Sequence, residues 1–67
     1  MSVYEKVRTY IDDQGLEQVA VAQKANLPVA TFNAILNGKQ TMHVDDLRAV
    51  CFALDVSPET FIEFNSV

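Results

Sequence analysis

The side chains able to do covalent or metal chemistry are few in this sequence, and they form no catalytic set. The chain has one histidine, His43, and one cysteine, Cys51. It has no glycine-rich phosphate loop and no nucleophile–base pair, and 67 residues leave little room for a cleft. No Cys/His cluster has the spacing of metal ligands. The sequence therefore predicts no enzyme, no cofactor, no metal site and no small-molecule substrate.

Charge is distributed unevenly along the chain, and the pattern favours binding over catalysis. Between Gln18 and Val44 there are two lysines, Lys24 and Lys39, and no acid. The rest of the chain holds all nine acids and three basic residues, and the formal net charge is −4. The acid-free stretch is suited to approach a polyanion such as DNA. Two lysines release few counterions, however, so we expect a monomer to bind DNA weakly.

Length and composition indicate a single domain over residues 1–67. A chain of 67 residues with 49% hydrophobic content can form a small core. A domain this short buries only ~60% of its unfolded surface and is marginal alone. The N-terminus reads MSVYEKVR, which does not resemble a signal peptide, and no apolar run approaches the ~20 residues of a membrane span. We expect a cytoplasmic protein.

Local signals predict five helices and no strand. Ser2 and Glu5 have the spacing of a capping box, and Gly15, Asn26 and Gly38 accept the left-handed conformation that ends a helix. The predicted helices run from Ser2 to before Gly15, from about Glu17 to Ala25, from Pro28 or Val29 to Leu36, from about Val44 to Leu54, and from Ser57 through Phe64.

The predicted inner faces follow the helical spacing of apolar residues. Cys51 lies on the apolar face of the fourth helix, so we expect a core thiol. His43 directly precedes that helix, where it would be an N-cap or a loop residue. The residues expected to point inward are Val3, Val7, Tyr10, Ile11, Val21, Ala22, Ala25, Leu27, Thr31, Phe32, Ile35, Val44, Leu47, Val50, Cys51 and Leu54.

The stretch from Leu16 to Ser57 carries a family resemblance. It reads LEQVAVAQKANLPVATFNAILNGKQTMHVDDLRAVCFALDVS. The spacing of its signals resembles the Cro- and lambda-repressor-like helix-turn-helix family, and these signals are Gln18, the Val21-Ala22 pair, the turn Asn26-Leu27-Pro28, inward Phe32 and Ile35, Asn37-Gly38-Lys39, and Val56-Ser57. The resemblance implies an all-α, five-helix, lambda-repressor-like DNA-binding domain with a helix-turn-helix at about residues 17–36.

The resemblance also implies roles for single residues. Gln18 matches the family's phosphate-contacting glutamine at the start of the motif. The positions that face base edges are matched by Val29, Ala30 and Asn33. Backbone contacts after the recognition helix are matched by Asn37 and Lys39, and loop positions that can approach DNA by Gln40 and His43.

The recognition positions depart from the family pattern. The family often has Gln, Arg or Ser where this chain has Val29 and Ala30. These two side chains can touch thymine methyl groups but cannot hydrogen-bond a base. Asn33 is the one side chain on that face able to pair with adenine. We therefore expect few direct hydrogen bonds between this face and the base edges of DNA.

Apolar residues at expected surface positions suggest a second kind of contact. Val19, Val29 and Phe52 stand where the family commonly has polar or charged residues, and the last helix cannot easily bury both Ile62 and Phe64. If these residues are contiguous, they mark a partner or dimer interface.

Two hypotheses follow from these observations. The first is a phage-type transcriptional regulator in a lysis–lysogeny switch. It would act in the bacterial host cell and bind operator DNA together with a phage repressor protein. It would form a homodimer through the fifth helix and place two recognition helices ~34 Å apart. The alternative is an antirepressor that binds and inactivates the cognate phage repressor without binding DNA tightly itself, because the sequence also resembles the small modulator-of-repression proteins of temperate phages. Its acidic charge would steer it towards a basic DNA-binding partner.

Overall fold

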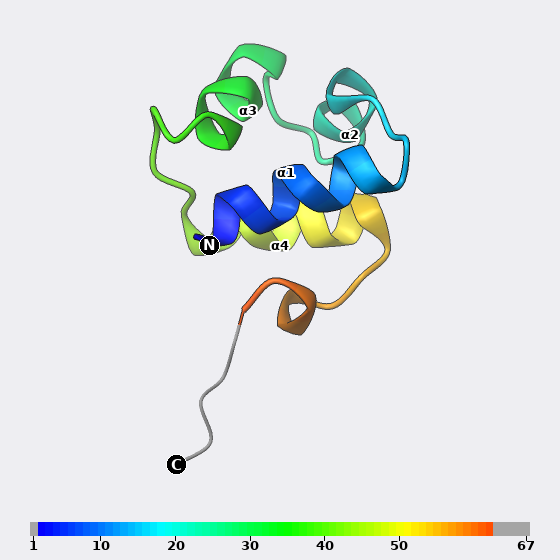
Figure 1. Cartoon of the computed structure of the whole chain (residues 1–67). Coiled ribbons are helices and arrows are strands. Elements are labelled where there is room, and N and C mark those ends of the chain that lie inside the picture. The colour runs from blue at the N-terminus through cyan, green and yellow to red at the C-terminus, as the bar shows by residue number, and fades with distance from the viewer. Residues whose placement is uncertain (1, 63–67) are drawn as a thin grey trace.

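The computed structural model describes residues 2–62, which form four α-helices and one 3₁₀ turn. The elements are α1 (Val3–Asp13), α2 (Gln18–Lys24), α3 (Val29–Leu36), α4 (Val44–Leu54) and η1 (Pro58–Thr60). In Figure 1, α2 and α3 lie together at one end of the molecule, α1 and α4 lie below them, and η1 is at the opposite end. The described residues include no strand, so an all-α fold is confirmed for this part of the chain.

Side chains close in the sequence determine where α1 and α4 begin. The predicted capping box at Ser2 is present: the Ser2 backbone N–H donates to Glu5 Oε1 at 3.0 Å and the Ser2 hydroxyl donates at 2.9 Å. These bonds favour the charged carboxylate and lower the pKa of Glu5. At the start of α4, the His43 backbone N–H donates to Asp46 Oδ2 at 3.0 Å. His43 is thus the N-cap of α4, one of the two roles expected for it.

All four α-helices end in the same hydrogen-bond pattern. One residue adopts a left-handed conformation, and the next backbone N–H reaches back to a carbonyl five residues earlier, as in a Schellman motif. After α3, for example, Gly38 has φ +73° and the Lys39 N–H donates to the Ala34 carbonyl at 2.9 Å. The left-handed residues are Gly15, Asn26, Gly38 and Asp55. The first three stops are confirmed predictions, whereas Asp55 was not predicted.

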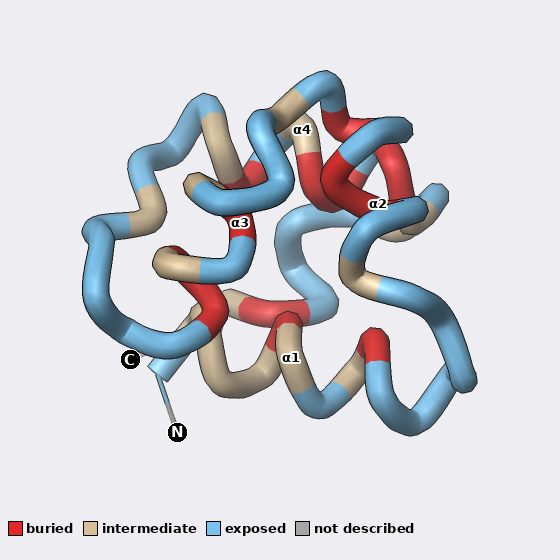
Figure 2. The backbone as a smooth tube through the Cα atoms, turned by 90° about the horizontal axis from the view of Figure 1, so that it is seen from above, coloured by how far each residue is buried: buried red, intermediate tan, exposed pale blue. Residues whose placement is uncertain are grey.

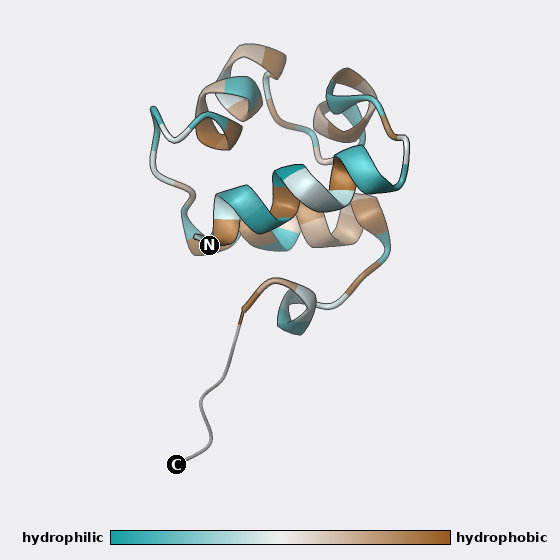
Figure 3. Ribbon diagram, viewed as in Figure 1, coloured by the Kyte–Doolittle hydropathy of each residue, from teal (hydrophilic) through white to brown (hydrophobic). Residues whose placement is uncertain are grey.

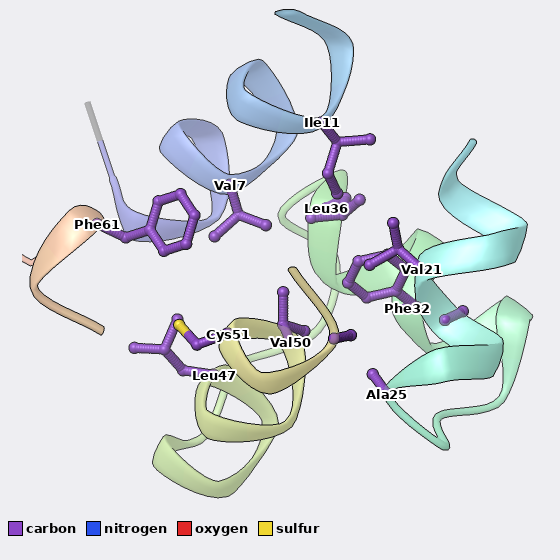
Figure 4. Packing of buried hydrophobic residues seen from close by; sticks show 12 residues of the cluster. Val7, Ile11, Val21, Ala25, Phe32, Leu36, Leu47, Val50, Cys51 and Phe61 are labelled. Carbon is purple, nitrogen blue, oxygen red and sulfur yellow. The ribbon is translucent and has the colours of Figure 1, made fainter. Parts of the chain in front are cut away.

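The core lies between the four helices. Figure 4 shows Phe32 of α3 next to Val21 of α2, and Leu36 of α3 below Ile11 of α1. Val50 and Cys51 of α4 complete the centre. Among the described residues no polar or charged side chain is buried. In Figure 2 the buried segments of the helices face the interior, and the connections between the helices are mostly exposed.

The fold departs from the prediction of five α-helices, which is wrong for the part of the chain that is described. After α4 there is one 3₁₀ turn, with bonds from the Thr60 N–H to the Ser57 carbonyl and from the Phe61 N–H to the Pro58 carbonyl, both 3.0 Å. This single turn already inserts Phe61 into the core, where its ring meets Tyr10 edge-on at 5.5 Å. A longer helix is not needed to bury it. Phe64 lies outside the described residues.

One inward residue of α4 was also predicted wrongly. Val44 is 67% exposed, although it has the helical spacing of the apolar face. It is the first residue of α4, and the buried residues of this helix begin only at Leu47. By contrast, Cys51 is 2% exposed, as expected for a core thiol. Desolvation raises the pKa of this thiol, so it stays protonated and shielded.

Candidate nucleic-acid interface

The helix-turn-helix is formed by α2, the turn 25–28 and α3. Asn26 adopts φ +60°, and the Leu27 N–H donates to the Ala22 carbonyl at 2.9 Å, which closes the turn. Ala22 is fully buried, and its small side chain lets α2 and α3 pack closely. Pro28 directly precedes α3, where a missing N–H costs nothing. The turn therefore fixes the direction in which α3 leaves α2.

One face of α3 points away from the core. We call the exposed residues Val29, Ala30, Asn33 and Asn37 the outer face of α3. The opposite side of the helix buries Phe32, Ile35 and Leu36. In Figure 3, α3 is mostly tan or brown, because Asn33 is its only strongly hydrophilic residue. The three positions expected to face base edges, and the Asn37 position, thus share one solvent-facing surface.

The two asparagines of this face are hydrogen-bonded to each other. Asn37 Nδ2 donates to Asn33 Oδ1 at 2.7 Å, across one turn of the helix. The spacing of four residues is the one at which side chains on a helix become neighbours. The sequence contained this signal, but the pair was not predicted.

The end of α3 is held by contacts from α1. Arg8 Nη1 donates to the Leu36 carbonyl at 3.0 Å in a partly buried position. A cation at the C-terminus of a helix also interacts favourably with the helix dipole. Next to it, a Cβ placed on Gly38 would lie 2.6 Å from the Tyr4 hydroxyl oxygen, so a larger residue there would have to displace the Tyr4 ring. These contacts join residues about 30 positions apart, and no local pattern in the sequence indicates them.

The loop after α3 brings further predicted residues to the start of α1. Lys39 and Gln40 are exposed and line a shallow hollow together with Val3, Tyr4 and Met42. His43 is also exposed, but its backbone is committed to the N-cap of α4. Gln18 is the first residue of α2 and is half-buried. The predicted DNA-contacting residues therefore come from α2, α3 and this loop.

The apolar residues predicted as a partner or dimer interface are spread over several elements. Val19 of α2 is 47% exposed, Val29 of α3 is 38% exposed and Phe52 of α4 is 80% exposed. Ile62 is half-buried and packs against the core, so it offers less surface to a partner. Phe64 belongs to the residues that are not described.

Residues 2–62 contain neither a metal-binding cluster nor a membrane-spanning helix. There, no group of three or more His, Cys, Asp or Glu side chains is placed to hold a metal ion. None of the helices in the same range has the length and apolar character needed to cross a membrane.

Comparison with known proteins agrees with this geometry. The comparisons with curated proteins and with solved structures gave no match. A family model, described as the Cro/C1-type HTH DNA-binding domain, matches residues 6–66. The match covers α2, the turn and α3, and it extends over nearly the whole chain. The chain therefore belongs to the Cro/C1-type helix-turn-helix DNA-binding domain family.

Proposed function

We propose that this chain is a phage-type transcriptional regulator that places the outer face of α3 in the major groove of operator DNA. The observation that carries the proposal is the position of Val29, Ala30 and Asn33. All three occupy the exposed face of the second helix of the motif, inside a stretch of 27 residues without an acid. Every acid lies outside residues 18–44, so α2, the turn and α3 carry no negative side chain, and the acid next to them in the sequence is Glu17, the N-cap of α2.

The dimensions of α3 suit this role. An α-helix with its side chains is about 10–12 Å in diameter, and the major groove is about 12 Å wide, so the eight residues of α3 can enter it. Lys39 and Gln40, just beyond the end of α3, would then reach the phosphate backbone beside the groove. Gln18, at the start of α2, would contact phosphate on the other side. His43 is the weakest member of this set, because it sits at the far end of the loop and caps α4.

We include a protein partner in the proposal because the chain alone is expected to bind DNA weakly. Two lysines would release few counterions, and the formal net charge of −4 opposes non-specific binding to DNA. We infer that the chain acts in a lysis–lysogeny switch together with a repressor protein or as a homodimer on two half-sites. The exposed Val19 and Phe52 are the residues on which such a partner would pack.

Fluorescence anisotropy of the purified protein on the DNA upstream of its gene tests the proposal. The measurement is made at two salt concentrations, with and without a repressor encoded beside that gene. We expect site-specific binding that weakens with salt, and further weakening in the double variant Asn33→Ala with Lys39→Ala. The matched control is Gln14→Ala, which removes an exposed amide at the end of α1 and leaves both the α3 surface and the proposed partner residues unchanged. Binding that is absent under all these conditions, or insensitive to salt, would contradict the proposal.

An antirepressor is the second candidate, and one observation favours it. The first two residues of α3 are Val29 and Ala30, which offer DNA no hydrogen bond but could pack on another protein. The acidic remainder of the chain would attract the basic face of a repressor. Here the test is co-purification with that repressor. Loss of the complex in Val29→Asp, but not in Phe52→Ser, would support it, whereas a complex that survives Val29→Asp would exclude α3 as the interface.

A further inference from the structure

The hydrogen bond between Asn33 and Asn37 has a consequence for base recognition. A solvent-exposed asparagine amide can turn by 180° about its last side-chain bond, and this turn exchanges its donor and acceptor. Here the Asn37 amide donates to Asn33 Oδ1 at 2.7 Å. That bond holds the oxygen of Asn33 towards the C-terminal end of α3 and leaves its NH₂ group on the other side.

Asn33 keeps enough hydrogen-bonding capacity to contact a base. An amide oxygen has two lone pairs, and the bond from Asn37 uses one of them. One acceptor site and two N–H donors therefore remain. In the major groove adenine presents an acceptor, N7, beside a donor, the N6 amino group, whereas guanine presents two acceptors. An amide with fixed order can match adenine and will oppose its oxygen to the guanine O6.

The neighbours of Asn33 strengthen the same preference. Val29 precedes it by one turn on the outer face of α3, and Ala30 lies beside it. Neither side chain can hydrogen-bond a base, but both can contact the methyl group of thymine. The face therefore combines one oriented amide with an apolar surface, and both features fit A·T base pairs.

We propose that Asn37 is a positioning residue, which orients the Asn33 amide so that α3 selects an adenine at one position of its site, with thymine beside it. This inference rests on the proposed function, because it concerns the same face of α3. It gives Asn37 a role beyond the backbone contact that the family resemblance implies. A residue that only touches phosphate would raise affinity for every sequence equally, and this difference makes the two roles separable.

Selection from a pool of random duplex DNA, followed by binding to single selected duplexes, tests the inference. We expect the wild-type chain to enrich a site with a constant adenine, and a change of that adenine to guanine to weaken binding at least tenfold. In Asn37→Ala the ratio between the affinities for the adenine duplex and the guanine duplex should fall to about threefold or less. Asn37→Asp should also lose the ratio, because a carboxylate cannot donate to Asn33 Oδ1. The control Gln23→Glu adds the same charge at an exposed position of α2 that has no assigned DNA contact, and it should keep the ratio.

A measurement without DNA separates this inference from the proposed function. The side-chain ¹⁵N relaxation of Asn33 should show a restricted amide in the wild-type chain and a more mobile one in Asn37→Ala, with both proteins folded by circular dichroism. A mobile Asn33 amide in the wild type overturns the inference whatever the DNA results are. An enriched site whose ratio survives Asn37→Ala overturns the inference alone. If the wild type enriches no site, the proposed function fails and the inference fails with it.

Discussion

α3 and α4 expose the same helical positions but fill them with different chemistry. Counted from the first residue of each helix, the first, second and fifth positions face solvent in both, and so does the ninth, which for α3 is the C-cap Asn37. In α3 they hold the outer face defined above, which carries no charge. In α4 they hold Val44, Asp45, Arg48 and Phe52, which we call the outer face of α4. Helix geometry provides both surfaces, and only the side chains distinguish a face suited to phosphates from one suited to something else.

The two helices also differ in how the rest of the molecule holds them. The end of α3 receives Arg8 from α1 at the Leu36 carbonyl, and Tyr4 of α1 packs directly on Gly38. The outer face of α4 has Phe52 80% exposed, with no such clamp described. A fixed helix is what groove recognition requires, because base contacts depend on precise placement of a few side chains. The comparison thus supports the proposal that α3 contacts DNA, and it leaves the outer face of α4 available to another partner.

The largest expected effect tests how tightly the end of α3 is held. Gly38→Ala should destabilise the fold by about 3 kcal/mol, because a Cβ there meets the Tyr4 ring and hydroxyl and the left-handed conformation is strained. Gly15→Ala is the matched control: its φ is also positive, but no atom lies within 4 Å of the new Cβ. We expect about 1 kcal/mol there. Urea denaturation measures both, and equal losses would show that the Tyr4 contact is unimportant.

The next prediction compares the two outer faces directly. Ala30→Glu and Phe52→Glu add the same charge to exposed positions of α3 and α4. The first should weaken DNA binding at least tenfold, or about 1.4 kcal/mol, because the new carboxylate faces phosphates and bases. The second should change affinity less than about twofold at physiological salt, because charges far apart are screened. Equal effects in an anisotropy titration would remove the distinction between the faces.

A smaller effect is expected from the hydrogen bond that Arg8 donates to the Leu36 carbonyl. Arg8→Met keeps much of the side chain's volume but removes the hydrogen bond to Leu36, and it should cost about 1 kcal/mol of stability. Arg48→Met, on the outer face of α4, is the control and should cost less than about 0.5 kcal/mol. Thermal melts followed by circular dichroism decide between them. If Arg48→Met loses as much stability as Arg8→Met, the hydrogen bond from Arg8 to the Leu36 carbonyl has no special role in holding α3.

The smallest expected effect concerns the inner side of α4. Burial raises the pKa of the Cys51 thiol above its ordinary value of 9.0. The folded state therefore keeps a proton that the unfolded state loses, and the resulting stability is present below pH 9.0 and declines as the pH rises towards the folded-state pKa. Urea denaturation of the wild type and Cys51→Ala at pH 7 and pH 10 measures this. We expect the wild type to lose more stability between the two pH values, and parallel losses would contradict the assignment.

Local sequence patterns were sufficient for most of the helix boundaries. α3 and α4 run over the residues that capping, proline and glycine signals predicted, because these signals act within a few residues. The buried Phe32 and Ile35 followed from helical spacing. The left-handed Asp55 was not predicted, although aspartate is one of the non-glycine residues that adopt this conformation more often than most. The length of the last helix was overestimated, because Pro58 and Glu59 indicate where a helix begins but not where it ends.

The candidate site was predictable as a set of positions but not as an arrangement. The family pattern indicated Val29, Ala30 and Asn33, and all three lie on the exposed side of α3. The contacts that hold this helix could not be read from the sequence, because Arg8 and Leu36 are 28 residues apart. The Asn33–Asn37 bond could have been inferred from its spacing of four residues.

The most direct test of the account is an NMR titration of the ¹⁵N-labelled chain with a duplex selected from random DNA. The account predicts that backbone amide shifts concentrate at residues 29–40, on α3 and the loop after it, and that the outer face of α4 stays unperturbed. Shifts concentrated at Asp45, Arg48 and Phe52 would contradict it, because α4 and not α3 would then be the DNA-contacting helix.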